Sequence, residues 1–266
     1  QVHRHFGGGN AMNHACFWCL LFGILWTLPV TAYSQKGKTF TDQEVRNILD
    51  QVDQLYRGES SEGQMTMRVK TAHYQRSMTM KMWSYGEDYF LIRILEPKKE
   101  RGTATLKRDD QIYNYLPKVK RTLKIGSAMM GGSWMGSHFT NDDLVQSSRL
   151  ADDYTFQAHQ PTAETLQIEL IPKKNSAVVW GKISLVVQFP SLLPMSQDYY
   201  DEDLKKVRTL TFSKVKTLGG RKMPTTMKIV PVDKPEEFTE LTYEEMKFDA
   251  GIKPSFFSLT KLKSMR

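Results

Sequence analysis

Residues 64–83 read QMTMRVKTAHYQRSMTMKMW, and this stretch decides the class of fold. Met65, Met67 and Val69 alternate with polar residues, and the alternation returns after a turn at residues 72–74. Apolar residues at every second position are typical of a strand that buries one face. The stretch therefore predicts a β-hairpin with one methionine-rich face. The residues expected on that face are Met65, Met67, Val69, Met78, Met80 and Met82.

An amphipathic helix is expected just before the hairpin, at residues 41–56. Val45 and Ile48 begin a series of apolar residues at helical spacing, and Thr41 or Asp42 can cap the first turn. The apolar side of such a helix needs a partner. We expect it to cover the sheet that the hairpin begins.

Strand-like alternation continues to residue 248, with turn signals such as Asp109-Asp110 and Gly219-Gly220 between the strands. Short strands joined by tight turns favour an antiparallel meander, and the lack of a strand-helix rhythm disfavours a doubly wound nucleotide-binding fold. We expect a mainly β (α+β) fold of about eleven strands in one domain, residues 35–266. Periodicity alone leaves open whether the sheet closes into a barrel or stays half open.

A methionine- and glycine-rich segment separates the two halves of this β pattern. It reads SAMMGGSW at residues 127–134 and continues as MGSHFTNDDL at residues 135–144. Long apolar side chains are costly to leave in water, and glycines give the backbone freedom to move. We call residues 127–144 the lid segment and expect it to cover an apolar cavity. The lid residues expected at this cavity are Met129, Met130, Trp134, Met135 and Phe139.

Two interpretations of the apolar residues compete. Methionine is flexible and polarisable, so it fills irregular spaces and adapts to ligands of several shapes. Ordinary core packing explains any single methionine. The whole set, taken together with Trp83, Trp134 and Phe139, favours a cavity that accommodates lipid.

The beginning of the chain predicts export. Residues 1–11 precede the first methionine and have the character of upstream or non-native sequence. Residues 12–34 resemble a signal peptide, because the apolar run at residues 16–31 is shorter than the roughly 20 residues of a membrane-spanning helix. We expect cleavage between Ser34 and Gln35 and a periplasmic location. An uncleaved inner-membrane anchor is the alternative.

Charge and cysteine content narrow the possible partners and chemistries. Cys16 and Cys19 both lie in the leader, so the chain after it has no disulfide, thiolate metal site or cysteine nucleophile. Of the 37 basic residues only Arg4 precedes residue 35, which leaves 36 basic against 29 acidic residues and a net charge of +7. This excess suggests anionic partners such as phospholipid headgroups.

Signals of enzyme chemistry are weak. His73, His138 and His159 form no metal-binding motif, and we expect neither a metal nor a cofactor. Ser133 lies in GGSWMGS, where Met135 occupies the place of the second glycine of a nucleophile elbow. Phosphate-binding glycine motifs are missing as well. We therefore expect a protein that is not an enzyme.

A basic run at residues 117–124, PKVKRTLK, has three interpretations. It lacks the stacking aromatic residues of an RNA-binding motif, which disfavours nucleic acid. A solvated strand face and a docking patch for an anionic lipid or a membrane protein remain. The patch would consist of Lys118, Lys120, Arg121 and Lys124.

Six segments carry a family resemblance. They read FLIRILEPKKERGTATL at residues 90–106, YLPKVKR at 115–121, VVWGKISLVV at 178–187, LPMSQDYYDEDLKKVRTLTFSKVK at 193–216, GGRKMPTTMKI at 219–229 and FFSLTKLK at 256–263. With the lid segment, they resemble the outer-membrane lipoprotein-sorting (LolA-like) family, in particular its subfamily without an assigned cargo. The likeness covers nearly all of the chain after the leader, and the segments are specific as a set.

The resemblance implies a curved, half-open antiparallel barrel that encloses an apolar cavity with its helices. It implies a monomeric periplasmic carrier that holds acyl chains of a lipoprotein or a lipid and passes them toward the outer membrane, together with an inner-membrane exporter of the RND type. An arginine on an inner strand closes the lid in lipoprotein carriers, and Arg93 is the candidate for that role. The alternative is a non-enzymatic envelope module that docks a membrane protein.

Overall fold

A computed structural model describes residues 40–146 and 150–264. The upstream segment 1–11, the expected signal peptide 12–34 and the expected cleavage site before Gln35 lie outside the described residues. Among the helices that the structure describes, none is long and apolar enough to cross a membrane.

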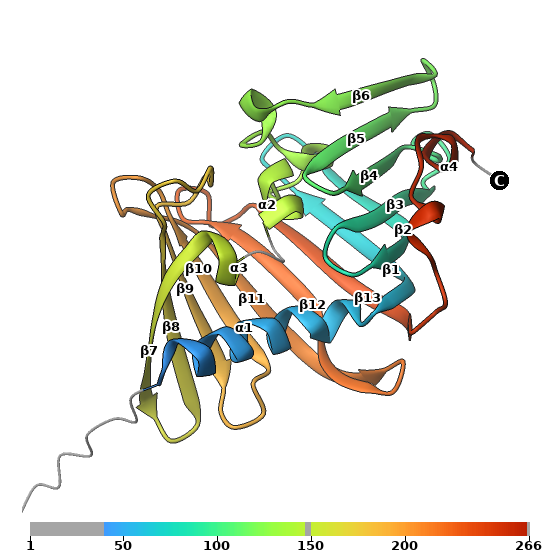
Figure 1. The fold of residues 1–266 in the computed structure, drawn as a ribbon. Coiled ribbons are helices and arrows are strands. Elements are labelled where there is room, and N and C mark those ends of the chain that lie inside the picture. Colours follow the sequence, from blue (N-terminus) through green and yellow to red (C-terminus); the bar gives the residue numbers. More distant parts are fainter. Residues whose placement is uncertain (1–39, 147–149, 265–266) are drawn as a thin grey trace, which may run out of the picture. The chain divides into compact units, whose positions relative to one another are not determined.

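One antiparallel sheet dominates the described residues (Figure 1). Its thirteen strands are β1 (Ser60–Lys70), β2 (Gln75–Tyr85), β3 (Tyr89–Glu96), β4 (Ala104–Arg108), β5 (Gln111–Leu116), β6 (Arg121–Ile125), β7 (Tyr154–Thr162), β8 (Thr165–Pro172), β9 (Lys182–Gln188), β10 (Pro194–Tyr200), β11 (Lys206–Leu218), β12 (Arg221–Pro231) and β13 (Phe238–Phe248). Neighbours in the sheet are neighbours in sequence except where β1 pairs with β13. Two meanders are thus joined edge to edge.

The expected curved, half-open barrel is confirmed, because the edge strands β6 and β7 of the described sheet do not pair with each other. The number of strands was underestimated, at about eleven rather than thirteen.

Short helices complete the fold. They are α1 (Asp42–Arg57), α2 (Asn141–Gln146), α3 (Leu150–Asp153), α4 (Leu259–Lys263) and the 3-10 turns η1 (Ser127–Met129), η2 (Trp134–Gly136) and η3 (Pro254–Phe256). Of the two expected caps, Thr41 caps α1, and the Glu44 carboxylate accepts from the backbone N–H of Thr41 in return. The apolar side of α1 packs into the main core through Val45, Ile48 and Leu49.

The methionine-rich hairpin has the predicted register and face. Met65 lies opposite Met80, and Met67 lies opposite Met78. Both pairs are buried in the main core, on the side of the sheet that α1 covers. Strand alternation therefore predicted this face correctly.

The opposite side of the sheet carries a smaller apolar cluster. On β3, Phe90 and Ile92 belong to the main core, whereas Leu91 between them packs with Phe257 and Leu262. Alternate side chains of a strand point to opposite faces. The C-terminal helix α4 thus packs on the outer face of the sheet at β3 and β4, and α1 packs on the inner face.

Candidate functional site

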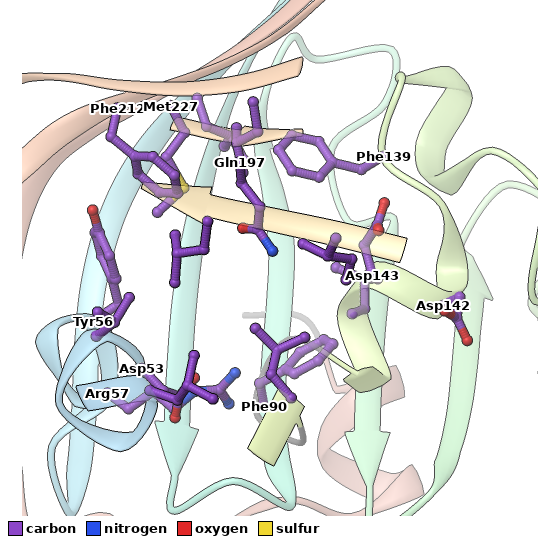
Figure 2. A pocket seen from close by; sticks show the side chains of 18 of the residues that line it. Asp53, Tyr56, Arg57, Phe90, Phe139, Asp142, Asp143, Gln197, Phe212 and Met227 are labelled. Atoms are coloured by element: carbon purple, nitrogen blue, oxygen red, sulfur yellow. The ribbon is translucent and has the colours of Figure 1, made fainter. Parts of the chain in front are cut away.

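An apolar cavity of ≈ 260 Å³ lies between α1, the inner face of the sheet and the lid segment (Figure 2). Segments far apart in sequence supply its walls. Its apolar lining includes Leu49, Val52, Met65, Met82, Phe90, Ile92, Trp134, Phe139, Ile183, Leu185, Leu210, Phe212, Met227 and Leu241. Curvature of the sheet thus brings inward-facing residues of the first strands and of β9–β13 around one space.

Polar groups are concentrated at two ends of this cavity. In Figure 2, Asp53, Tyr56 and Arg57 of α1 lie at one end and Asp142 and Asp143 at the other. Arg57 Nε donates to Asp53 Oδ1 at 2.8 Å. Burial raises the pKa of Asp53, and the charge of Arg57 opposes that shift. The lining between the two ends is mostly apolar, so the cavity suits a ligand that is mostly hydrocarbon.

Two aromatic residues of the lid segment line the cavity. Trp134 is 1% exposed, and its indole Nε1 donates to Thr105 Oγ1 of β4 at 3.0 Å. The backbone N–H of Trp134 donates to the carbonyl of Phe139 at 2.8 Å, which folds the segment into a tight loop. Trp134 is therefore fixed to the sheet, and Phe139 lies beside it over the cavity.

Arg208 on β11 fastens the lid segment to the sheet. Its Nη1 donates to the carbonyl of His138 and to Asp143 Oδ2, both at 2.9 Å. Its guanidinium lies 4.1 Å from the ring of Trp180 and 4.0 Å from that of Tyr199. Burial alone would lower the pKa of Arg208, but the charge and hydrogen bonds of Asp143 outweigh it and raise the pKa. We call the contacts of Arg208 with His138 and Asp143 the latch.

Further polar contacts hold the lid segment beside the latch. The backbone N–H of His138 donates to Thr239 Oγ1 at 2.9 Å, and its ring Nε2 lies 3.2 Å from Glu237 Oε2. Tyr74 donates to the carbonyl of Gly136. Tyr74 lies in the turn between β1 and β2, whereas Glu237 directly precedes β13 and Thr239 lies on it, so the lid segment bridges the two meanders.

Asp142 is a buried carboxyl group at the lid end of the cavity. It is 2% exposed, and its Oδ2 has no hydrogen-bond partner among the described residues. Burial and then the neighbouring Asp143 carboxylate raise the pKa of Asp142 to about 6, although a hydrogen bond from the backbone of Val179 lowers it. A carboxyl group in this setting is costly to ionise, and such groups are often functional.

The structure brings only part of the expected site together. Met65, Met82, Trp134 and Phe139 line the cavity. Other residues of the expected methionine face are completely buried in the same core but lie outside the lining: Met67, Val69, Met78 and Met80. Alternation predicts a face of the sheet, but it does not predict the position along that face.

The other expected cavity residues lie elsewhere. Met129 is 52% exposed, and Met130 packs against the small cluster around Ile112. Met135 lines a separate hollow beside Tyr74. Trp83 projects from the opposite face of the sheet, where its ring packs against that of Phe256 at a centroid distance of 5.7 Å.

Arg93 does not contact the lid segment in the part of the chain that the structure describes. Its Nη2 donates to the carbonyls of Lys261 and Leu262, at 2.9 and 3.1 Å, at the C-terminal end of α4. Arg208 makes the kind of contact that was expected of Arg93. Sequence reasoning missed Arg208, although a charged residue within the strand pattern of residues 206–218 is a signal that could have identified it.

Within residues 40–146 and 150–264, no group of three histidine, cysteine or acidic residues could hold a metal ion. The residues of the expected docking patch are all exposed on β6 and the turn before it: Lys118, Lys120, Arg121 and Lys124.

Comparison with known proteins indicates the family and the fold of this chain. A family model described as an uncharacterized protein matches residues 86–264. A search of curated proteins gave no match.

Solved structures with a similar fold include an outer membrane lipoprotein-sorting protein domain from Vibrio parahaemolyticus, at 23% identity and a TM-score of 0.73, over 84% of this chain and 100% of that one. A LolA superfamily protein from Nitrosomonas europaea is 19% identical, with a TM-score of 0.67. The match covers 81% of this chain and 97% of that one. A DUF1329 family protein from Desulfovibrio piger is 22% identical, with a TM-score of 0.73. The match covers 81% of this chain and 96% of that one. The chain therefore belongs to this family of uncharacterized proteins, and its fold is that of the LolA superfamily and of outer membrane lipoprotein-sorting domains.

Proposed function

We propose that the chain is a non-enzymatic carrier that binds acyl chains of a lipoprotein or a lipid in the apolar cavity. The observation that supports this most directly is the combination of an apolar cavity with a lid segment that a buried arginine helps to fasten to the sheet. An apolar space with few polar groups favours hydrocarbon, because burial of apolar surface supplies most of the binding free energy. The fold of lipoprotein-sorting domains supports the same function.

A long acyl chain enters this cavity only if the lid segment moves. The cavity of ≈ 260 Å³ is close to the lower end of the range for small-molecule sites, about 300–1,000 Å³. Trp134 and Phe139 occupy one side of it. Moving Phe139 away would disturb the adjacent carbonyl of His138, which accepts from Arg208. The latch is thus the point at which ligand entry and lid release would be coupled.

The carrier would work in the periplasm and deliver its cargo toward the outer membrane. The apolar leader at residues 12–34 supports export, and N-terminal sequencing of the periplasmic form should begin at Gln35. A membrane-bound form that keeps the leader would contradict this.

The exposed basic docking patch suits contact with anionic headgroups or with an RND-type exporter in the inner membrane. Charge reversal at Lys118 and Lys124 should therefore reduce binding to anionic vesicles. Unchanged binding would mean that the docking patch is only a solvated strand face.

A second candidate is an envelope module that uses the same half-open barrel to dock a membrane protein. Native mass spectrometry of the protein, extracted gently from the expressing cells, separates the two. Acyl species that copurify with the wild-type chain, and are lost from a Phe139→Asp variant, would support the carrier. A homogeneous, ligand-free chain that also fails to bind a fluorescent fatty-acyl probe would favour the module.

A further inference from the structure

Gln197 places a carboxamide in the middle of the apolar cavity. The residue lies on β10, is 8% exposed and belongs to the cavity lining. In Figure 2 its amide nitrogen and oxygen point away from the strand into the cavity, between the polar ends marked by Asp53 and Asp142. The register places Leu185 on one side of it and Leu210 on the other. A polar side chain therefore stands where both neighbours in the sheet are leucines.

The amide of Gln197 has no hydrogen-bond partner among the described side chains and backbone groups. Gln167 on β8 shows how a glutamine of the same sheet is normally satisfied. Its Nε2 donates to Glu169 Oε1 at 2.7 Å and to Ser184 Oγ at 3.0 Å. The amide of Gln197 is instead open to the cavity. A polar group that the protein itself does not satisfy is free to bind whatever occupies that cavity.

The chemistry of a carboxamide limits what that partner can be. A glutamine side chain offers two N–H donors and one carbonyl acceptor, and it carries no charge. A secondary amide in a ligand offers one acceptor and one donor, so it can satisfy both ends of the side chain. An ester or a carboxylate offers acceptors only and leaves the Gln197 oxygen unpaired.

We propose that Gln197 determines the specificity of the cavity and that the ligand is an amphiphile with an amide-linked acyl chain. This inference rests on the proposed acyl-binding function and names the ligand class for the same cavity. Tyr199, which stacks on the latch arginine, follows two residues later on the same face of β10, about 7 Å along the strand. The ligand's amide is therefore bound close beneath the lid segment, and the hydrocarbon extends toward Phe212 and Met227.

The test compares three ligands of equal chain length: N-methylhexadecanamide, methyl hexadecanoate and hexadecanoic acid. Each displaces a fluorescent fatty-acyl probe from the purified protein. We expect the wild-type chain to prefer the amide over the ester by about tenfold, the effect of one or two added hydrogen bonds. Gln197→Met, which keeps the length of the side chain, should bind both equally. Leu91→Met, on the opposite face of the sheet, leaves the cavity lining unchanged and should keep the wild-type preference.

Thermal unfolding of the ligand-free proteins gives an independent readout. Gln197→Met, and Gln197→Leu as a second variant, should unfold at the same temperature as the wild type or at a higher one. A lower unfolding temperature in both would assign the amide a structural role and overturn the proposal.

An equal preference for amide and ester in the wild type, or a preference that survives in Gln197→Met, would overturn the inference and leave the acyl carrier intact. If none of the three ligands displaces the probe, or no probe binds, the proposed function itself fails and the inference fails with it.

Discussion

Replacing Asp142 with asparagine should stabilise the protein at neutral pH, although the carboxyl group is buried and partly hydrogen-bonded. Burial and the charge of Asp143 raise its pKa from the ordinary 3.8 to about 6, so the folded state holds this proton more tightly than the unfolded state does. As the pH rises through this window, the folded protein must release a proton that the unfolded chain has already lost. Asp142 therefore costs no stability below about pH 4, becomes increasingly destabilising between about pH 4 and pH 6, and reaches its full destabilising effect above about pH 7.

The magnitude follows from the size of the shift. About two pKa units, at about 1.4 kcal/mol each, correspond to a destabilisation of about 3 kcal/mol above pH 7. Roughly 1 kcal/mol of it is already present at pH 4.5. Asparagine stays neutral, and its oxygen can still accept the hydrogen bond from Val179. The free energy of unfolding of Asp142→Asn should therefore exceed that of the wild type by about 2 kcal/mol more at pH 7.5 than at pH 4.5.

Urea unfolding of both proteins between pH 4.5 and 7.5 measures this difference. Asp143→Asn is the matched control, because it removes the same charge one residue away. In Asp143→Asn, the buried Arg208, 5% exposed, loses its carboxylate partner. The free energy of unfolding of this variant should therefore fall by about 3–5 kcal/mol. A stability gap for Asp142→Asn that does not change with pH, or a destabilised Asp142→Asn at pH 7.5, would refute the reasoning.

Three further substitutions, two of them paired with a control substitution, test the core, the cavity and the latch. Met80→Asp puts an unpaired charge into a completely buried site and should prevent folding, whereas Thr79→Asp on the other face should leave the circular dichroism spectrum and the unfolding temperature almost unchanged. Phe139→Ala should weaken binding of a fluorescent fatty-acyl probe by about fivefold to tenfold, as expected for a lost aromatic contact of about 1 kcal/mol. Leu91→Ala, on the opposite face, should lower stability by about 2–5 kcal/mol without changing probe affinity, and the reverse pattern would argue against this cavity. Arg208→Met should speed amide hydrogen exchange across residues 127–144 more than elsewhere, and uniform exchange would show that the latch does not hold the lid segment.

Local patterns predicted much of the fold because their causes are local. Capping by Thr41 depends on residues within one turn of α1, and the inward face of the first hairpin depends only on alternation. The pairing of β1 with β13 joins residues about 180 positions apart, such as Gln64 and Glu245. Alternation contains no information about such a distant partner.

The candidate site was less predictable for the same physical reason. In FLIRILEP, the residues before Glu96 on both sides of the alternation are apolar apart from Arg93 itself. Alternation therefore did not show which face of the strand carries Arg93. Its hydrogen bonds to α4 depend on where a five-residue C-terminal helix packs, which residues 90–97 do not encode. Gln197 and Arg208 could have been noticed as polar residues at inward strand positions, but their common cavity exists only once the sheet has curved.

The latch and the cavity share residues, and this sets a lower limit on the ligand. Tyr199, Trp180 and Asp143 all contact Arg208 and all line the cavity. Breaking a buried ion pair of this kind costs about 3–5 kcal/mol, whereas each buried methylene contributes about 0.8 kcal/mol. A chain must therefore bury roughly four to six methylenes before its binding can compensate for release of Arg208. Acyl probes of increasing length should show affinity that rises steeply only beyond this length, and a rise that is uniform from the shortest chain would mean that ligands enter without opening the latch.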